Sequence, residues 1–368
     1  MKRIFTVLTS IALTFVLSFS AAFANDDAFL KSQNYLKTIA LDSPDAVIAY
    51  EATGMEADYK ADALLNNFKE TDYVTASYGD LAKSIIAISL LGENPKDFNK
   101  TNLVEILENR VQEDGTLTND VNGGCGATIW TLMALETVNS PKVKAVADKL
   151  STMAMDKGAY WYEYQGPNAD LDTTGWAMEA LSVAGRSTYE AAISKAYTFV
   201  QSKLNSTDGY YDNWGGNADT QSCVLEGLSV AGYTLDTNAY NYLLSYQNED
   251  GTFNALNYST GQLEPNAYAS VEGARALGVI NNGSFVLKAR KDYTKTTTPV
   301  VTEPETPTTP TKPSTTTPAV KPETTTTEPK KETVKVVNTG DNTNVMAYVV
   351  AAVAAVGVIV LVIKSKKK

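Results

Sequence analysis

Apolar residues gather in five segments of the chain, and these segments return at a nearly constant interval. Each is rich in Ala, Leu, Val and Ile on more than one helical face, which is typical of a helix buried all round. Their starts are 47, 46, 47 and 46 residues apart. A period of this length predicts a repeat of helical units that share one core. The segments are Gly79–Gly92, Gly126–Asn139, Asp172–Gly185, Asp219–Gly232 and Pro265–Gly278.

A more polar stretch with helical character lies between neighbouring apolar segments, for example at residues 187–204. Each such stretch leads into a turn that contains glycine, at residues 114–115, 157–158, 208–209 and 250–251. A degenerate unit at residues 27–54 fits before the first segment, which makes about six helical hairpins between Asn25 and Tyr293. Alternating buried and amphipathic helices can close into a ring. The pattern therefore predicts one all-α domain over residues 25–293.

One of the turns carries a motif that points to a known superfamily. The stretch from Gln247 through Gly251 to Phe253 matches the Gln-x-x-x-Gly-x-aromatic repeat of terpenoid cyclases and protein prenyltransferases, and residues 205–211 and 112–117 are weaker copies. On these motifs the chain resembles that superfamily, and the resemblance implies an α/α toroid. The superfamily includes enzymes, carriers and thioester-bearing defence domains, so a shared fold does not fix the activity.

The first residues are typical of a secretory signal peptide. Lys2 and Arg3 supply the positive start, and an apolar run follows from Ile4 to Phe19. The small-x-small pattern Ala22-Phe-Ala24 predicts cleavage after Ala24. We therefore expect residues 1–24 to direct export and the mature chain to begin at Asn25.

The other end of the chain predicts a stalk and an anchor. Residues 294–335 form a Thr/Pro-rich tract that is too polar to bury a core, so a disordered stalk is expected. The apolar run at residues 345–363 is 19 residues long, enough for one C-terminal transmembrane helix. It ends in Lys-Ser-Lys-Lys-Lys, as the positive-inside rule expects for a cytoplasmic end.

Residues 336–368 resemble, in their order of features, the cell-wall sorting signal of Gram-positive surface proteins. Thr339 and Gly340 match the pair between which a sortase cuts, whereas Val336 and Val337 replace the usual Leu and Pro. The resemblance implies a sortase and peptidoglycan as partners. A plain membrane anchor is the alternative. Either reading predicts a folded domain displayed outside a Gram-positive cell, at the cell wall or the plasma membrane.

The charge of the chain argues against nucleic acid as a partner. The formal net charge is −11, and leaving out the six Lys and Arg residues at the two ends lowers it to −17. A strongly acidic body without a basic cluster is a poor binder of nucleic acid. Two cysteines in 368 residues exclude a disulfide framework.

The superfamily resemblance allows one test for cyclase chemistry. The acid motif of squalene-hopene-type cyclases is Asp-x-Asp-Asp-Thr, which protonates a carbon–carbon double bond. Asp170, Asp172 and Thr174 match it, whereas Thr173 stands in place of the last Asp. The motif is therefore degenerate, because a cluster that must keep one acid protonated has lost a member.

Other chemistries of the superfamily lack a required residue. The chain has no histidine, so Asp219 and Cys223 cannot complete the Asp-Cys-His zinc site of a prenyltransferase, and no zinc site is expected. Gly124-Cys125-Gly126 matches the start of a thioester motif, but Ala127-Thr128 replaces the Glu-Gln that the thioester needs. Cys125 is therefore expected to be a small buried residue.

Carboxylates recur within the last three apolar segments. Asp172 and Asp219 are placed to cap a helix start, and Pro265 also suits such a position. Seven residues later the segments carry Glu179, Glu226 and Glu272, on the same stripe of each helix. A charge on a buried helix is costly unless it is paired or wet. The Glu residues predict either a hydrated interior or a set of structural hydrogen bonds.

Aromatic residues precede or follow the same helix starts, and they suggest a ligand-binding mouth. A small-molecule or glycan ligand would suit such a mouth, and the resemblance also allows cobalamin as a ligand. The sequence thus favours a surface receptor or adhesin domain. The alternative is an extracellular enzyme, either cyclase-like or carbohydrate-active, in which Asp170, Asp172, Glu179 and Glu226 would be catalytic. The expected ligand-binding residues are Trp161, Tyr164, Trp176, Tyr210, Tyr211, Trp214 and Asp219.

Overall fold

The computed structural model describes residues 26–56, 66, 68–120, 124–162, 166–213 and 215–297. All of these lie in the first of two compact units, Met1–Thr302. The predicted signal peptide, the sortase-like pair Thr339 and Gly340, and the apolar run at 345–363 lie outside the described residues. Within the described ranges, no helix is both long and apolar enough to cross a membrane.

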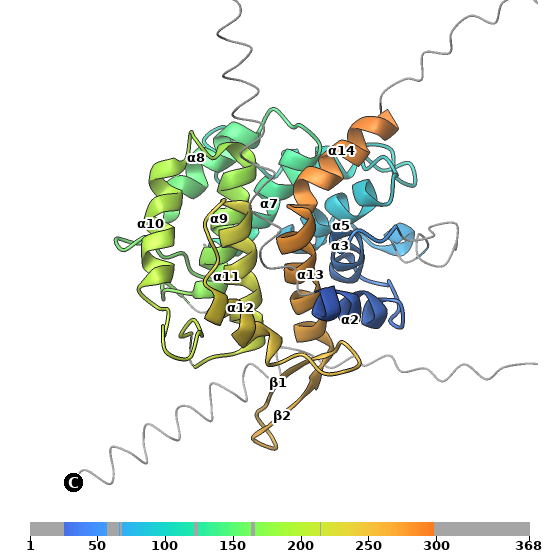
Figure 1. Cartoon of the computed structure of the whole chain (residues 1–368). Helices are drawn as coiled ribbons and strands as arrows, with labels where there is room; N and C mark the ends of the chain where they lie inside the picture. Colours follow the sequence, from blue (N-terminus) through green and yellow to red (C-terminus); the bar gives the residue numbers. More distant parts are fainter. Residues whose placement is uncertain are drawn as a thin grey trace, which may run out of the picture. The chain divides into compact units, whose positions relative to one another are not determined.

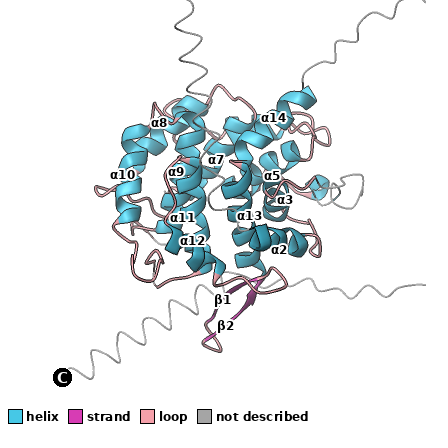
Figure 2. Cartoon of the chain, viewed as in Figure 1, coloured by secondary structure: helices cyan, strands magenta, loops and turns pink. Residues whose placement is uncertain are grey.

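The described part is mostly helical, as the sequence predicts (Figures 1 and 2). Six of its helices are buried over most of their length, and we call these the inner helices. They are α3 (Pro44–Ala52), α5 (Tyr78–Leu90), α7 (Gly126–Thr137), α9 (Leu171–Gly185), α11 (Ala218–Val230) and α13 (Ala267–Asn282). The others bury only one stripe or cover an end. They are α2 (Asp26–Leu36), α6 (Leu103–Glu108), α8 (Val143–Met153), α10 (Glu190–Gln201), α12 (Thr237–Leu244) and α14 (Phe285–Thr297).

The inner helices pack on one another in the order of the sequence. Helix α3 contacts α5, and the contacts continue through α7, α9 and α11 to α13. Helix α13 in turn packs against α3, so the series of contacts returns to its first member. Helices α9 and α11 approach closely because each has a glycine at the contact. A Cβ at Gly175 would lie 2.3 Å from a backbone oxygen of α11, and a Cβ at Gly227 would lie 2.2 Å from one of α9.

Four turn glycines share one geometry, which supports the repeat read from the sequence. Gly115, Gly158, Gly209 and Gly251 have φ angles of 82, 91, 86 and 86°, in the left-handed region that glycine tolerates best. A Cβ at each would lie 2.0 to 2.4 Å from a main-chain oxygen of the following outer helix. For Gly251 that oxygen belongs to Lys31 of α2, so the last of these turns packs on the first described helix.

We expect Gly251→Ala to lower the free energy of unfolding by about 3 kcal/mol, because it adds an overlap with the Lys31 oxygen to left-handed strain. Gly92→Ala is the matched control, since Gly92 has φ +70° but nothing within 4 Å of the added Cβ. That variant should lose only about 1 kcal/mol. Urea unfolding of both variants measures the difference. Equal losses would mean that the turn does not pack on α2 as described.

A β-hairpin interrupts the helical repeat, which the sequence did not predict. Strand β1 (Phe253–Asn257) pairs antiparallel with β2 (Gln262–Asn266), and Figure 1 shows the hairpin extending beyond the helices. Pro265 lies in β2 opposite Asn254, so its prediction as a helix start is wrong. Helix α13 begins at Ala267, because the Asn266 side chain accepts a hydrogen bond from Ala269 N at 3.0 Å and caps the first turn.

Helix α14 covers the last turns of three inner helices and was also not predicted. Lys288 pairs with Glu51 of α3, and Arg290 pairs with Glu136 of α7 at 2.6 Å. Near its end, the Thr296 hydroxyl donates to the Gly92 carbonyl just beyond α5. The helix runs to Thr297, into the start of the segment predicted as the stalk.

Candidate functional site

Of the acids at the starts of α9 and α11, one caps its helix and two lie within the first helical turn. Asp170 has an extended backbone and accepts a hydrogen bond from Thr173 N at 2.7 Å, so it caps α9. In α11 the cap is Asn217, whose side chain accepts from Thr220 N at 2.8 Å. The prediction that Asp172 and Asp219 act as caps is therefore wrong. Both already lie within the first helical turn, two residues after the cap, where their side chains are free for other contacts.

These acids lie close together. The Asn213 side-chain nitrogen lies 3.3 Å from both Asp170 Oδ2 and Asp172 Oδ1, and 3.3 Å from the Thr220 hydroxyl. Burial, with the negative charges of Asp170 and Asp219, raises the pKa of Asp172 to about 7. Burial also raises the pKa of Asp219, and among the described residues its Oδ1 atom has no hydrogen-bond partner. Asp172 and Asp219 therefore take up a proton more readily than exposed Asp residues do.

The next layer comes one turn further along the helices. Trp176, Cys223 and Glu272 each lie six residues after the cap of their helix, which is Asp170, Asn217 or Asn266. The Cys223 sulfur lies 3.9 Å from Glu272 Oε2. Burial raises the pKa of Glu272 to about 8 although the Arg275 charge opposes this. Burial also raises the pKa of the Cys223 thiol well above its usual value, so it is a poor nucleophile.

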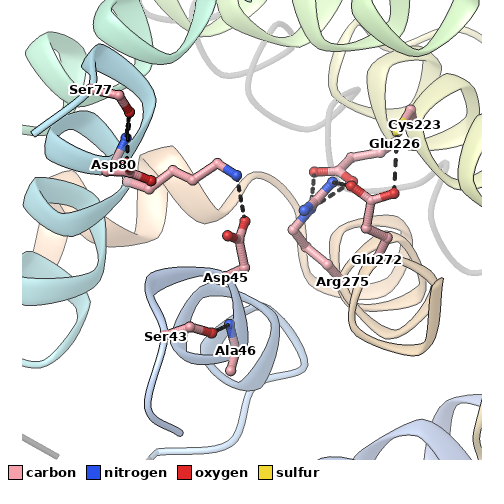
Figure 3. Close-up of polar contacts among 10 residues, drawn as sticks. Ser43, Asp45, Ala46, Ser77, Asp80, Cys223, Glu226, Glu272 and Arg275 are labelled. Atoms are coloured by element: carbon pink, nitrogen blue, oxygen red, sulfur yellow. Dashed lines mark hydrogen bonds and ion pairs between the residues drawn. The ribbon is translucent and has the colours of Figure 1, made fainter. Parts of the chain in front are cut away.

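The deepest layer differs from the stripe that the sequence suggested. Nine residues after the three caps stand Glu179, Glu226 and Arg275, not Glu272. The sequence pattern predicts Pro265 as the start of the last inner helix, with Glu272 seven residues further on. Pro265 lies in β2 instead, and α13 begins only at Ala267. The Arg275 Nε atom donates to both oxygens of Glu226, at 3.1 and 3.0 Å, and Nη2 lies 3.8 Å from Glu272 Oε1. Figure 3 shows Arg275 against these two carboxyl groups.

Glu179 is fully buried and accepts a hydrogen bond from the Ser284 hydroxyl at 3.0 Å. Its burial and the neighbouring Glu226 charge hold its pKa well above the usual range. Glu179 therefore keeps its proton to a higher pH than an exposed Glu does. Since no solvent reaches it, this carboxyl group cannot meet a bulky substrate directly.

A second polar group lies on α3 and α5. Lys83 pairs with Asp45 at 2.8 Å, and its ammonium lies 4.6 Å from the centroid of the Trp130 ring. Trp130 in turn packs against Trp176, with ring centroids 5.7 Å apart. Asp45 also contributes to the electrostatic surroundings of Arg275, which places the two groups near each other. The Asp45 and Lys83 side chains keep 30% and 19% exposure, so water reaches this region.

The described aromatic residues of the predicted mouth lie in different places. Trp176 lies with the acids, one turn from Asp172. Tyr211 is fully buried in the core, and Tyr210 packs against Tyr242 with centroids 5.4 Å apart. Trp161 lines a separate pocket near α8. Tyr164 and Trp214 lie outside the described residues.

Several residues of the site had no signal in the repeat alone. Asn213 is in a turn, Ser284 follows α13, and the Lys83–Trp130 contact joins two helices. Arg275 was visible as a basic residue in an otherwise apolar segment, but its partners depend on the packing of α11 against α13. Cys125 is buried, as expected. Among the described residues, no three His, Cys, Asp or Glu side chains are grouped to hold a metal ion.

The site is rich in carboxyl groups relative to basic ones. Glu226 is paired with Arg275, and Glu272 makes a longer contact with the same guanidinium. Within the described ranges, Asp172, Asp219 and Glu179 have no basic side chain at ion-pair distance. Such groups either keep a proton or accept a positively charged partner. The arrangement can therefore bind a cation or donate a proton.

No protein-family model matches the chain, and no curated protein is similar enough to count as a relative.

Proposed function

We propose that the chain is a surface-displayed binding module built on an α/α toroid. The succession of inner-helix contacts that returns from α13 to α3 supports this architecture. The turn at Gly251, which packs on α2, supports it independently. In this proposal residues 1–24 direct export, and the stalk and anchor hold the domain at the wall or membrane of a Gram-positive cell.

The ligand-binding site of this proposal is the group of acids at the starts of α9, α11 and α13. The observation that carries it is the excess of carboxyl groups, including the buried Asp219 oxygen that has no partner among the described residues. A charge or polar atom left unpaired inside a protein costs free energy, which a complementary ligand recovers. Tyr268, at the start of α13, is 53% exposed and marks a side open to solvent.

The ligand class that fits best is a small molecule with one or more amino groups. An ammonium group donates hydrogen bonds to carboxylates and compensates their charge. Aromatic faces also attract cations, and the Lys83 ammonium over Trp130 shows that an indole ring in this region accepts one. Trp176, whose ring nitrogen has no partner among the described residues, would line the same site.

A thermal-shift screen of the full chain at pH 8 tests this proposal, with cadaverine and spermidine as amines and with cobalamin and neutral sugars for comparison. The wild type should be stabilised by an amine. Asp219→Asn should bind that amine at least tenfold more weakly, because a neutral amide replaces the unpaired carboxylate. The matched control is Asp97→Asn, which removes the same charge from an exposed position. Stabilisation by cobalamin alone, or equal amine binding by Asp219→Asn, would contradict the proposed ligand class.

An extracellular enzyme is the second candidate, and one observation favours it. Asp172 is half-buried with a pKa of about 7 beside Asp170, which suits a general acid. The two residues also match the first acids of the cyclase motif. This candidate expects Asp172→Asn to abolish turnover of a polyprenyl or glycan substrate while Trp176→Ala only weakens binding. Measured turnover with that response would replace the receptor proposal.

A further inference from the structure

Two pockets of similar volume flank the C-terminal end of α8, and none of their lining residues belongs to the acid site. One has a volume of about 390 Å³ and lies between α8, the start of α7 and the turn after α6. The other has about 400 Å³ and lies between α8 and the start of α10. Thr152, which is exposed, lines both pockets, so the two are adjacent. A ligand that extends across Thr152 would occupy both.

The two pockets have matching chemistry. Each contains an aromatic ring, one Asp, one Lys, a methionine and hydroxyl groups of Thr or Ser, so neither carries a net charge. In the first pocket these residues are Trp161, Asp120, Lys149, Met153, Thr116, Thr128 and Thr152. In the second they are Tyr189, Asp156, Lys195, Met155, Ser151, Thr152 and Thr188. Two neighbouring pockets with the same set of groups suit a ligand with repeating units.

The aromatic rings are held in place before any ligand arrives. The Trp161 carbonyl accepts a hydrogen bond from Cys125 N at 3.0 Å, and the side chain packs partly on the hydrophobic core. The Tyr189 hydroxyl donates to Asp148 at 2.9 Å. Fixed rings reduce the ordering cost of binding.

We propose that these pockets bind adjacent units of a neutral oligosaccharide. A sugar ring presents C–H groups on its face, which would pack on the partly exposed Trp161 of the first pocket, and hydroxyl groups at its rim, which would pair with Asp, Lys and Thr in both pockets. In the second pocket the Tyr189 ring is only 7% exposed and forms part of the wall. Each volume lies in the range of about 300–1,000 Å³ that is usual for small-ligand sites. A peptide strand is a poorer fit, because the pockets lie between helices and offer no sheet edge for strand addition.

The test is calorimetric titration of the full chain with neutral tetrasaccharides of glucose, N-acetylglucosamine, xylose and mannose. At least one should bind, and Trp161→Ala should weaken it about tenfold through loss of the aromatic face. Lys195→Ala, in the second pocket, should weaken binding of that tetrasaccharide several-fold. The corresponding monosaccharide, titrated alongside, should still bind this variant at the first pocket as it binds the wild type. Lys37→Ala, just after α2, is the charge-matched control and should bind as the wild type does.

Failure of the oligosaccharide proposal can be told apart from failure of the amine proposal, because Trp161→Ala should leave amine binding unchanged. Lys195→Ala keeps the test decisive if Trp161→Ala fails to fold. Absence of binding by all four tetrasaccharides would overturn the proposal. Wild-type affinity of both Lys195→Ala and a folded Trp161→Ala for the tetrasaccharide would also overturn it. Tighter binding of an extended peptide at the same pockets would do the same.

Discussion

Replacing Glu226 with Gln is expected to lower the free energy of unfolding by about 4 kcal/mol, because the substitution leaves a buried charge without its main partner. Arg275 is 1% exposed, and its Nε atom donates to both Glu226 oxygens. A guanidinium group does not give up its proton within a protein. The remaining Glu272 contact, at 3.8 Å, is too long to replace a paired hydrogen bond. Urea unfolding at pH 7 measures the loss.

The double variant Glu226→Gln/Arg275→Met separates the buried charge from simple loss of packing. It should recover most of the stability lost in Glu226→Gln, because it removes the unpaired guanidinium as well. Arg275→Met alone should be milder than Glu226→Gln, since a buried Glu can take up a proton whereas Arg cannot lose one. A loss below about 1 kcal/mol in Glu226→Gln would show that the pair is not buried as described.

The stability of the ligand-free chain should fall as the pH rises from about 4 to about 9, by an amount on the order of 8 kcal/mol. In the folded state the pKa of Asp172 is about 7 and that of Glu272 about 8, above their ordinary values of 3.8 and 4.5. The folded state therefore holds these protons more tightly than the unfolded state. Their stabilisation is complete below the ordinary pKa values and is lost as pH rises through 7 to 8.

Asp172→Asn tests the origin of this dependence, because an amide cannot ionise. Its unfolding free energy should match that of the wild type near pH 4 and exceed it near pH 9 by on the order of 4 kcal/mol. Asp97→Asn, at an exposed position, should follow the wild-type profile. Thermal unfolding at intervals of one pH unit shows the profiles. Parallel curves for Asp172→Asn and the wild type would contradict the raised pKa.

The helical repeat could be predicted because its signals are local. Burial on all faces marks the inner helices, and a glycine at each turn is required by a left-handed φ and a close backbone contact. The register of α13 could not be predicted in the same way. Strands β1 and β2 add residues before that helix, so counting from Pro265 placed Glu272 where the fold places Arg275.

The candidate site was predicted in part. The acids Asp172, Asp219, Glu179 and Glu226 were visible in the sequence because they repeat on buried helices. Their partners were not, because Asn213 lies in a turn and Ser284 lies between α13 and α14. The Lys83–Asp45 pair was not visible either, because it joins α5 to α3. Tyr211 looked like a binding residue but packs in the core, since aromatic composition alone does not say which way a turn faces. Helix α14 covers the inner helices through long-range ion pairs that have no local signature.

The most direct test of the proposed ligand site is the number of protons released when an amine binds. At pH 7 Asp172 should be about half protonated and Glu272 mostly protonated, so an ammonium group that pairs with them must displace protons. Titration of the full chain with spermidine in two buffers of different ionisation enthalpy gives this number. We expect release of about one proton at pH 7 and an affinity that rises from pH 6 to pH 9. Binding without proton release, at an affinity independent of pH and unchanged in Asp219→Asn, would contradict it.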